Sequence, residues 1–121
     1  MAGKKTKLEL NEFLNRIVIE ITSKLDIDEI LLFGSYAKGE ENDCSDIDIA
    51  VISSEFDPKK SMYLNAMKVY EKTDLIEPYL QLVPLSSDSF YNETFTDKGF
   101  VRSIKETGIS IYSKRTSSNL V

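Results

Sequence analysis

The first part of the chain carries a helical pattern of apolar residues. Apolar side chains recur every three or four positions, as they do on one face of an α-helix: Leu10, Phe13, Leu14, Ile17, Val18, Ile21 and Leu25. The spacing predicts a helix over residues 9–25, preceded by a polar tail at residues 1–8. The apolar stripe of this helix is expected to face the core.

Two short apolar runs follow, separated by polar and turn-forming residues. Ile30–Phe33 is a continuous run that ends at Gly34, which predicts a buried strand entering a glycine turn. Residues 47–52 predict a second strand, and Asp46 just before it and Asp48 within it alternate with isoleucines. Because side chains alternate between the faces of a strand, both carboxylates should project from the same face.

The middle of the chain predicts another helix and a third strand. Pro58 is suited to the first turn of a helix that runs to about Lys72, with Asp57 as its N-cap. Leu75–Leu85 is mostly apolar but holds two prolines. Since proline cannot donate to a ladder, this strand is expected near an edge of the sheet or bent.

The C-terminal part of the chain predicts short helices followed by a final strand. Ser86–Asp88 predicts a helix cap, and a last short helix is expected over Lys98–Glu106. Gly108 fits the position just past a helix end, before a final strand at Ile109–Tyr112. No repeat or linker interrupts the pattern, which predicts one α/β domain over residues 9–112 and a polar tail at 113–121.

The amino-acid composition limits which catalytic groups and metal ligands the chain can supply. The 121 residues include no histidine, which excludes histidine-based catalysis and histidine metal ligands. The single cysteine, Cys44, excludes an internal disulfide and a thiolate zinc site. Any bound metal must therefore be held by oxygen, which favours Mg²⁺, Mn²⁺ or Ca²⁺.

Charge and hydropathy indicate where such a protein would act. The 20 acidic residues outnumber the 15 basic ones, for a net charge of −5, which opposes direct nucleic-acid binding. No apolar run approaches the ~18 residues of a membrane span, and the first residues lack the apolar stretch of a signal peptide. We therefore expect a cytoplasmic protein without a membrane segment.

One combination of residues points to phosphate chemistry. Gly34 lets the backbone approach a ligand closely, and Ser35 can start a helix whose N–H groups suit a phosphate. Ten residues later, Asp46 and Asp48 place two carboxylates on one face of a strand, where they can hold divalent cations. Lys38 is placed to reach a phosphate, although an exposed loop lysine is the commoner case.

These residues resemble the Gly-Ser-x10-Asp-x-Asp signature of the DNA polymerase β nucleotidyltransferase superfamily. The segments Leu31–Gly39 and Ser45–Val51 are similar, more narrowly, to the minimal nucleotidyltransferases. The resemblance covers about residues 9–112, of which residues 31–52 are diagnostic. It implies a small mixed sheet with helices packed against it.

The same resemblance implies a reaction and a set of roles. A nucleoside triphosphate, most often ATP, would bind with Mg²⁺, two ions being usual, and its nucleotidyl group would pass to a hydroxyl. Gly34 and Ser35 would hold the terminal phosphates. Asp46 and Asp48 would hold the metals.

The family uses a third carboxylate on a later strand, and its identity here is open. Glu77 is the first choice, because related chains often carry Ile-Glu-Pro at this place, and Asp74 is close by. If the strand aligns instead through residues 80–83, Gln81 occupies the place of the carboxylate. An amide binds metal weakly and cannot act as a base, so that alignment predicts a crippled enzyme.

The family also suggests the acceptor. Minimal nucleotidyltransferases are commonly paired with an all-helical HEPN protein in a toxin–antitoxin system. The leading hypothesis is therefore an antitoxin that transfers AMP to a tyrosine of a HEPN partner in a hetero-oligomer. Two alternatives are a degenerate chain that neutralises its partner by contact alone, and a transferase for a small aminoglycoside-like hydroxyl compound.

Overall fold

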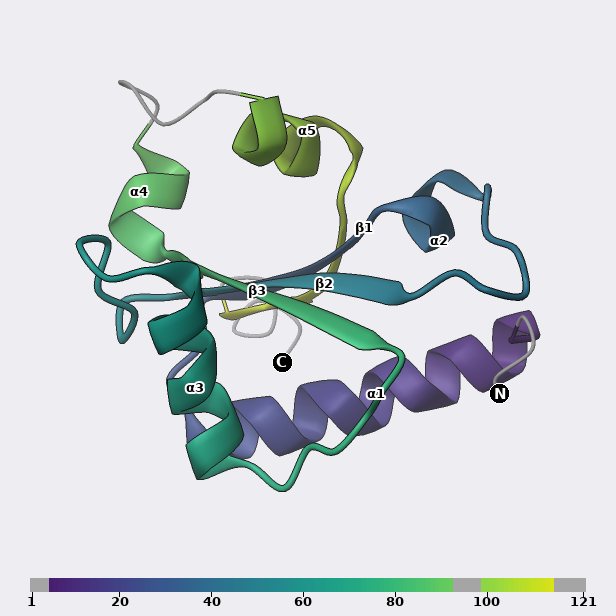
Figure 1. Cartoon of the computed structure of the whole chain (residues 1–121), viewed down its shortest axis with the longest axis horizontal. Coiled ribbons are helices and arrows are strands. Elements are labelled where there is room, and N and C mark those ends of the chain that lie inside the picture. The colour runs from purple at the N-terminus through teal and green to yellow at the C-terminus, as the bar shows by residue number, and fades with distance from the viewer. Residues whose placement is uncertain (1–4, 93–98, 115–121) are drawn as a thin grey trace.

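A four-stranded sheet forms the centre of the protein. Its strands are β1 (Glu29–Phe33), β2 (Ile47–Ser53), β3 (Leu80–Ser86) and β4 (Ile109–Ser113), in the spatial order β3-β2-β1-β4. β2 runs parallel to β3, and β1 runs antiparallel to β2 and β4, so the sheet is mixed. In this computed structural model, which describes residues 5–92 and 99–114, helices lie on both faces of the sheet (Figure 1). The predicted α/β fold with a mixed sheet is confirmed.

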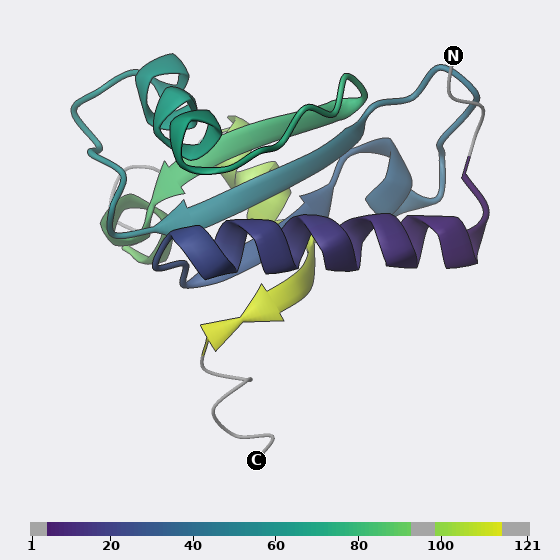
Figure 2. The ribbon, with the colours of Figure 1, turned by 90° about the horizontal axis from the view of Figure 1, so that it is seen from below.

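One face of the sheet is covered by two helices, α1 (Lys7–Lys24) and α3 (Met62–Lys72). Figure 2 shows α1 extending along this face, with β3 and β4 toward opposite edges. Their apolar side chains form the larger core cluster with the inward residues of the strands, including Ile17, Ile21, Ile30, Ile49 and Val69. None of the helices in the described part of the chain is long and apolar enough to span a membrane.

α1 begins two residues before the predicted start at residue 9. Thr6 caps the helix by accepting a hydrogen bond from Glu9 N at 3.1 Å, and the Glu9 carboxylate accepts one from Thr6 N at 2.9 Å. This reciprocal capping box satisfies two backbone N–H groups at the helix start. It therefore draws Lys7 and Leu8, expected in the polar tail, into the first turn.

The opposite face is covered by α4 (Ser87–Tyr91) and α5 (Gly99–Thr107). A second, smaller core cluster joins Phe90 and Ile104 from these helices to the strand residues Leu31, Ala50 and Ile52. The predicted cap before α4 is confirmed, because Ser86 Oγ accepts from Ser89 N at 3.1 Å. The prediction for α5 is confirmed apart from Lys98, which lies outside the described residues.

The predicted helix start at Pro58 is wrong. α3 begins at Met62, and its N-cap is Ser61, whose hydroxyl accepts from Leu64 N at 3.2 Å. Asp57, expected as the cap, forms a turn in which its carboxylate accepts from Lys59 N at 2.9 Å. An aspartate followed by proline suits such a turn as well as it suits a helix cap.

The third strand is shorter than predicted. Of Leu75–Leu85, only the part from Leu80 onward pairs with β2. Pro78 has no backbone N–H, and Leu80 N donates to Glu77 O at 3.0 Å in a turn that precedes the strand. The expected edge position is confirmed, since β3 lies at one end of the strand order and carries Pro84.

Candidate functional site

The glycine-serine turn lies directly against the second aspartate. Gly34 follows β1, has a φ of +74° and precedes the single-turn helix α2 (Ser35–Lys38). A Cβ atom added to Gly34 would lie 3.1 Å from Asp48 Cγ and would overlap Asp48 Oδ2. Only glycine lets the backbone of this turn and the carboxylate lie so close together.

α2 is anchored through its middle residues. Tyr36 and Ala37 pack against the larger core cluster, and the Tyr36 hydroxyl accepts from Lys5 N at 3.4 Å. Lys38 is exposed at the C-terminal end of the turn. The N–H groups of the first turn of a helix have no partner within the helix, so those after Gly34 can meet an anion. In a helix of one turn, this capacity belongs to the N–H groups themselves rather than to a macrodipole.

Hydrogen bonds hold the backbone segment that carries Asp46 and Asp48. In the loop before β2, Asn42 N donates to Ser45 Oγ at 2.9 Å, and Ser45 N donates to Asn42 O at 3.1 Å. At the first residue of the strand, Ile47 N donates to Tyr79 O at 2.8 Å. These bonds hold the segment on both sides of the first aspartate, which lies just before the strand, while the second lies within it.

The surroundings of Asp48 disfavour its charged form. Burial raises the pKa of Asp48, and the negative charge of Asp46 raises it further. A divalent cation between such groups would relieve this repulsion. Magnesium is usually held by one or two carboxylates together with substrate phosphates, so the oxygen donors of Asp46 and Asp48 fit it.

A row of side chains crosses the sheet at this site. Phe33 on β1 and Gln81 on β3 are the register partners of Asp48 on β2. Register partners on neighbouring strands project from the same face, so the three side chains lie side by side. This is the face of the smaller core cluster, and Phe100 of α5 packs edge-to-face on Phe33 with ring centroids 5.7 Å apart.

The site therefore lies on the face of the sheet that α4 and α5 cover, at the end of the sheet next to α2 (Figure 1). Phe33 and Phe100 border it, and the sequence motifs assign neither of them a functional role. The apolar run before Gly34 could have indicated Phe33, because that residue is adjacent to the glycine turn. The position of Phe100 depends on how α5 packs, which no local pattern shows.

Glu77, predicted as the third carboxylate, lies beside α1 in this structure. Its side chain forms an ion pair with Arg16 of α1, with Glu77 Oε2 2.9 Å from Arg16 Nη1. The alternative, Asp74, donates its backbone N–H to Glu20 of the same helix at 3.0 Å. Within residues 5–92 and 99–114, no three cysteine or acidic side chains lie close enough together to hold a metal. The side chain opposite Asp48 is the amide Gln81.

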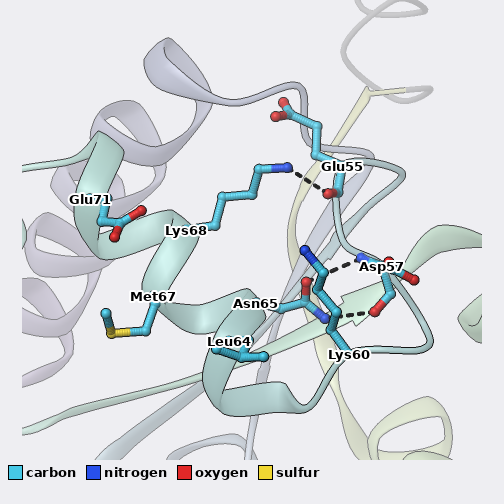
Figure 3. Close-up of a pocket in the computed structure, with 8 residues that line it drawn as sticks. All are labelled: Glu55, Asp57, Lys60, Leu64, Asn65, Met67, Lys68 and Glu71. Atoms are coloured by element: carbon cyan, nitrogen blue, oxygen red, sulfur yellow. Dashed lines mark hydrogen bonds between the residues drawn. The ribbon is translucent and has the colours of Figure 1, made fainter.

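A pocket of about 350 Å³ lies beside α3, as Figure 3 shows. Its polar groups serve the local structure: Asn65 Nδ2 donates to Asp57 O at 2.9 Å, and Lys68 Nζ donates to Glu55 O at 2.8 Å. Its walls contain neither the glycine turn nor Asp46 and Asp48. We therefore treat the glycine-aspartate site as the candidate functional site.

Comparison with known proteins shows which proteins this chain is similar to. The family described as "Polymerase beta, Nucleotidyltransferase" matches residues 15–117. Two proteins of Methanocaldococcus jannaschii named as candidate protein adenylyltransferases are similar in sequence. MJ1379 is 42% identical over 72 residues, which cover 56% of this chain and 69% of the relative. MJ0126 is 32% identical over 83 residues, which cover 69% of this chain and 82% of the relative.

Two solved structures share the fold. A candidate nucleotidyltransferase from Sulfolobus solfataricus has a TM-score of 0.62 at 18% identity, covering 93% of each chain. A toxin–antitoxin structure with AMP-PNP has a TM-score of 0.53 at 21% identity, covering 88% of this chain and 77% of the other. At these identities the similarity shows a common fold.

Proposed function

Because the chain belongs to the polymerase β nucleotidyltransferase family, we propose that it transfers AMP from ATP to a hydroxyl group, with Mg²⁺ held by Asp46 and Asp48. The observation that carries this proposal is the close packing of Gly34 against Asp48. It joins the two halves of the motif, which are separated in sequence by a loop, into one site.

Each residue has a role in this proposal. The backbone at Gly34 and Ser35, with the Ser35 hydroxyl, binds the terminal phosphates, and Lys38 is within the same turn. When bound, Mg²⁺ offsets the charge that develops on the phosphate oxygens. The acceptor oxygen forms a bond to the α-phosphorus, the bond to pyrophosphate breaks, and the acceptor proton passes to solvent.

The proposed acceptor is a tyrosine of a partner HEPN protein, which would make the chain an antitoxin. The names of the two Methanocaldococcus relatives support a protein acceptor. The toxin–antitoxin structure of similar fold, solved with an ATP analogue, supports the pairing with a toxin. In such a pair the acceptor surface belongs to the partner.

A second candidate function is neutralisation by binding alone. The observation that favours it is Gln81 opposite Asp48, because an amide supplies neither charge nor a base at that position. The two functions differ in one respect that can be measured. Neutralisation by contact survives loss of the aspartates, whereas neutralisation by AMP transfer does not.

The test is the intact mass of a HEPN protein encoded beside this chain, after incubation with the chain, ATP and Mg²⁺. A gain of one or more AMP groups that is absent with Asp46→Asn/Asp48→Asn supports the transferase. A stable complex without any gain supports the binding function. AMP transfer to an aminoglycoside in the absence of a partner would favour the small-molecule alternative.

A further inference from the structure

The residue beside Asp48 on the neighbouring strand β3 has a polar side chain without charge. Gln81 is the register partner of Asp48 on the parallel strand β3, and it is exposed, whereas its neighbours Leu80 and Leu82 are buried in the larger core cluster. Alternation along the strand therefore turns Gln81 away from that core, toward the face on which Asp48 lies. Strands in a sheet are about 4.8 Å apart, so a glutamine side chain easily reaches the neighbouring carboxylate.

Glu77 and Asp74 are both bonded to α1, Glu77 through its carboxylate and Asp74 through its backbone N–H. Arg16 pairs with Glu77, and Glu20 accepts from the backbone of Asp74. The turn at Pro78 then separates these residues from the start of β3. The register of β3, rather than the proximity of acids in the sequence, determines which side chain meets the aspartates.

We propose that Gln81 is the third side chain of the cation site. Because this ligand carries no charge, it keeps the affinity of the site for a free divalent cation low. This inference rests on the proposed nucleotide and metal site. Asp46 and Asp48 supply two carboxylates, and the amide oxygen of Gln81 adds a donor without adding charge. The missing charge comes from the triphosphate, so the cation enters the site together with the nucleotide.

Manganese binding in the absence of nucleotide tests this proposal directly, measured by electron paramagnetic resonance of the free ion. We expect weak binding by the wild-type chain and about tenfold tighter binding by Gln81→Glu, since one added charge near a cation is worth roughly that factor. Asn15→Asp is the matched control, because it makes the same amide-to-acid change at an exposed position of α1, on the opposite side of the sheet.

A second comparison separates the ligand from a general charge effect. Adding Asp48→Asn to Gln81→Glu should remove the gain, because the two side chains would bind the same ion. Equal manganese affinity of Gln81→Glu and Asn15→Asp, in chains shown to be folded by circular dichroism, would overturn the proposal. So would a gain that persists in the double variant.

The outcome is independent of whether AMP transfer occurs. If Gln81→Glu tightens manganese binding and the wild-type chain transfers no AMP to its partner, the placement of Gln81 stands and the proposed transferase activity fails. If AMP transfer occurs and Gln81→Glu leaves manganese binding unchanged, the activity stands and the placement of Gln81 fails.

Discussion

Gly34 and Asp48 are packed so closely that a methyl group on Gly34 would overlap the Asp48 carboxylate. Gly34 also has a φ of +74° and a ψ of −153°, a region of backbone conformation that is almost restricted to glycine. We therefore expect Gly34→Ala to lower the free energy of unfolding by about 3 kcal/mol. Urea denaturation measures this loss, and AMP transfer should fall with it because Asp48 is displaced.

Gly39 provides the control for that substitution. Its φ of +73° and ψ of 23° lie in the left-handed helical region, and a Cβ atom there would meet nothing within 4 Å. Gly39→Ala should therefore lower the free energy of unfolding by only about 1 kcal/mol. Equal losses for the two variants would show that the contact with Asp48 is unimportant.

Glu55 should make folding stability depend on pH in the acid range. The backbone N–H of Asp26, which donates to Glu55 Oε2 at 2.6 Å, together with Lys72, lowers the pKa of Glu55 below its ordinary value of 4.5. The folded state thus favours the charged carboxylate, whose contribution is present above pH 4.5 and is lost as the pH falls through the lower folded-state pKa.

Comparison of the wild-type chain with Glu55→Gln measures this contribution. At pH 7 the free energy of unfolding of the variant should be about 1 kcal/mol lower than that of the wild-type chain, because a partly exposed, charge-assisted hydrogen bond is lost. The difference should shrink at about pH 3, where the wild-type carboxylate is increasingly protonated. Glu71→Gln, at an exposed position of α3, controls for the change in net charge. A difference that is constant with pH would contradict the assignment.

The start of α3 offers a third test. Ser61 Oγ accepts from Leu64 N at 3.2 Å and caps the helix, so Ser61→Ala should lower the free energy of unfolding by about 1 kcal/mol. Hydrogen exchange of the Leu64 amide should become faster in the same variant. Asp57→Ala is the comparison, because Asp57 bonds to Lys59 in a turn outside the helix. Faster exchange of Leu64 in Asp57→Ala, with none in Ser61→Ala, would restore Asp57 as the cap.

The parts of the fold that local patterns determine were predictable. The apolar stripe of α1, the run before Gly34 and the alternation around Asp48 each depend on residues close together in the sequence. The structure adds that the glycine turn and Asp48 lie in contact, which no pattern local to either segment predicts. Patterns of this kind indicate on which face of a helix or strand a residue lies, and that assignment holds in the folded protein.

The third strand shows where such reasoning stops. The Ile-Glu-Pro tripeptide predicts Glu77 as the third ligand, whereas alignment through residues 80–83 predicts Gln81. The choice between them depends on the register between β3 and β2, and a shift along the strand changes which side chain faces Asp48. The turn at Pro78 is local, but the ion pair of Glu77 with Arg16 and the pairing of β3 with β2 both join residues distant in sequence.

Removing the charge of Glu77 distinguishes these two alignments by function. Glu77 pairs with Arg16 on the surface, so Glu77→Gln should change the free energy of unfolding by less than about 1 kcal/mol and leave AMP transfer to the partner unchanged. Asp48→Asn, which makes an equal change of charge at the site, should reduce transfer at least about a hundredfold if the carboxylate holds the cation. Initial rates of AMP incorporation at saturating ATP measure both. A loss with Glu77→Gln as large as that with Asp48→Asn would mean that Glu77 reaches the cation during the reaction, and that its pairing with Arg16 is broken when the nucleotide and the partner bind.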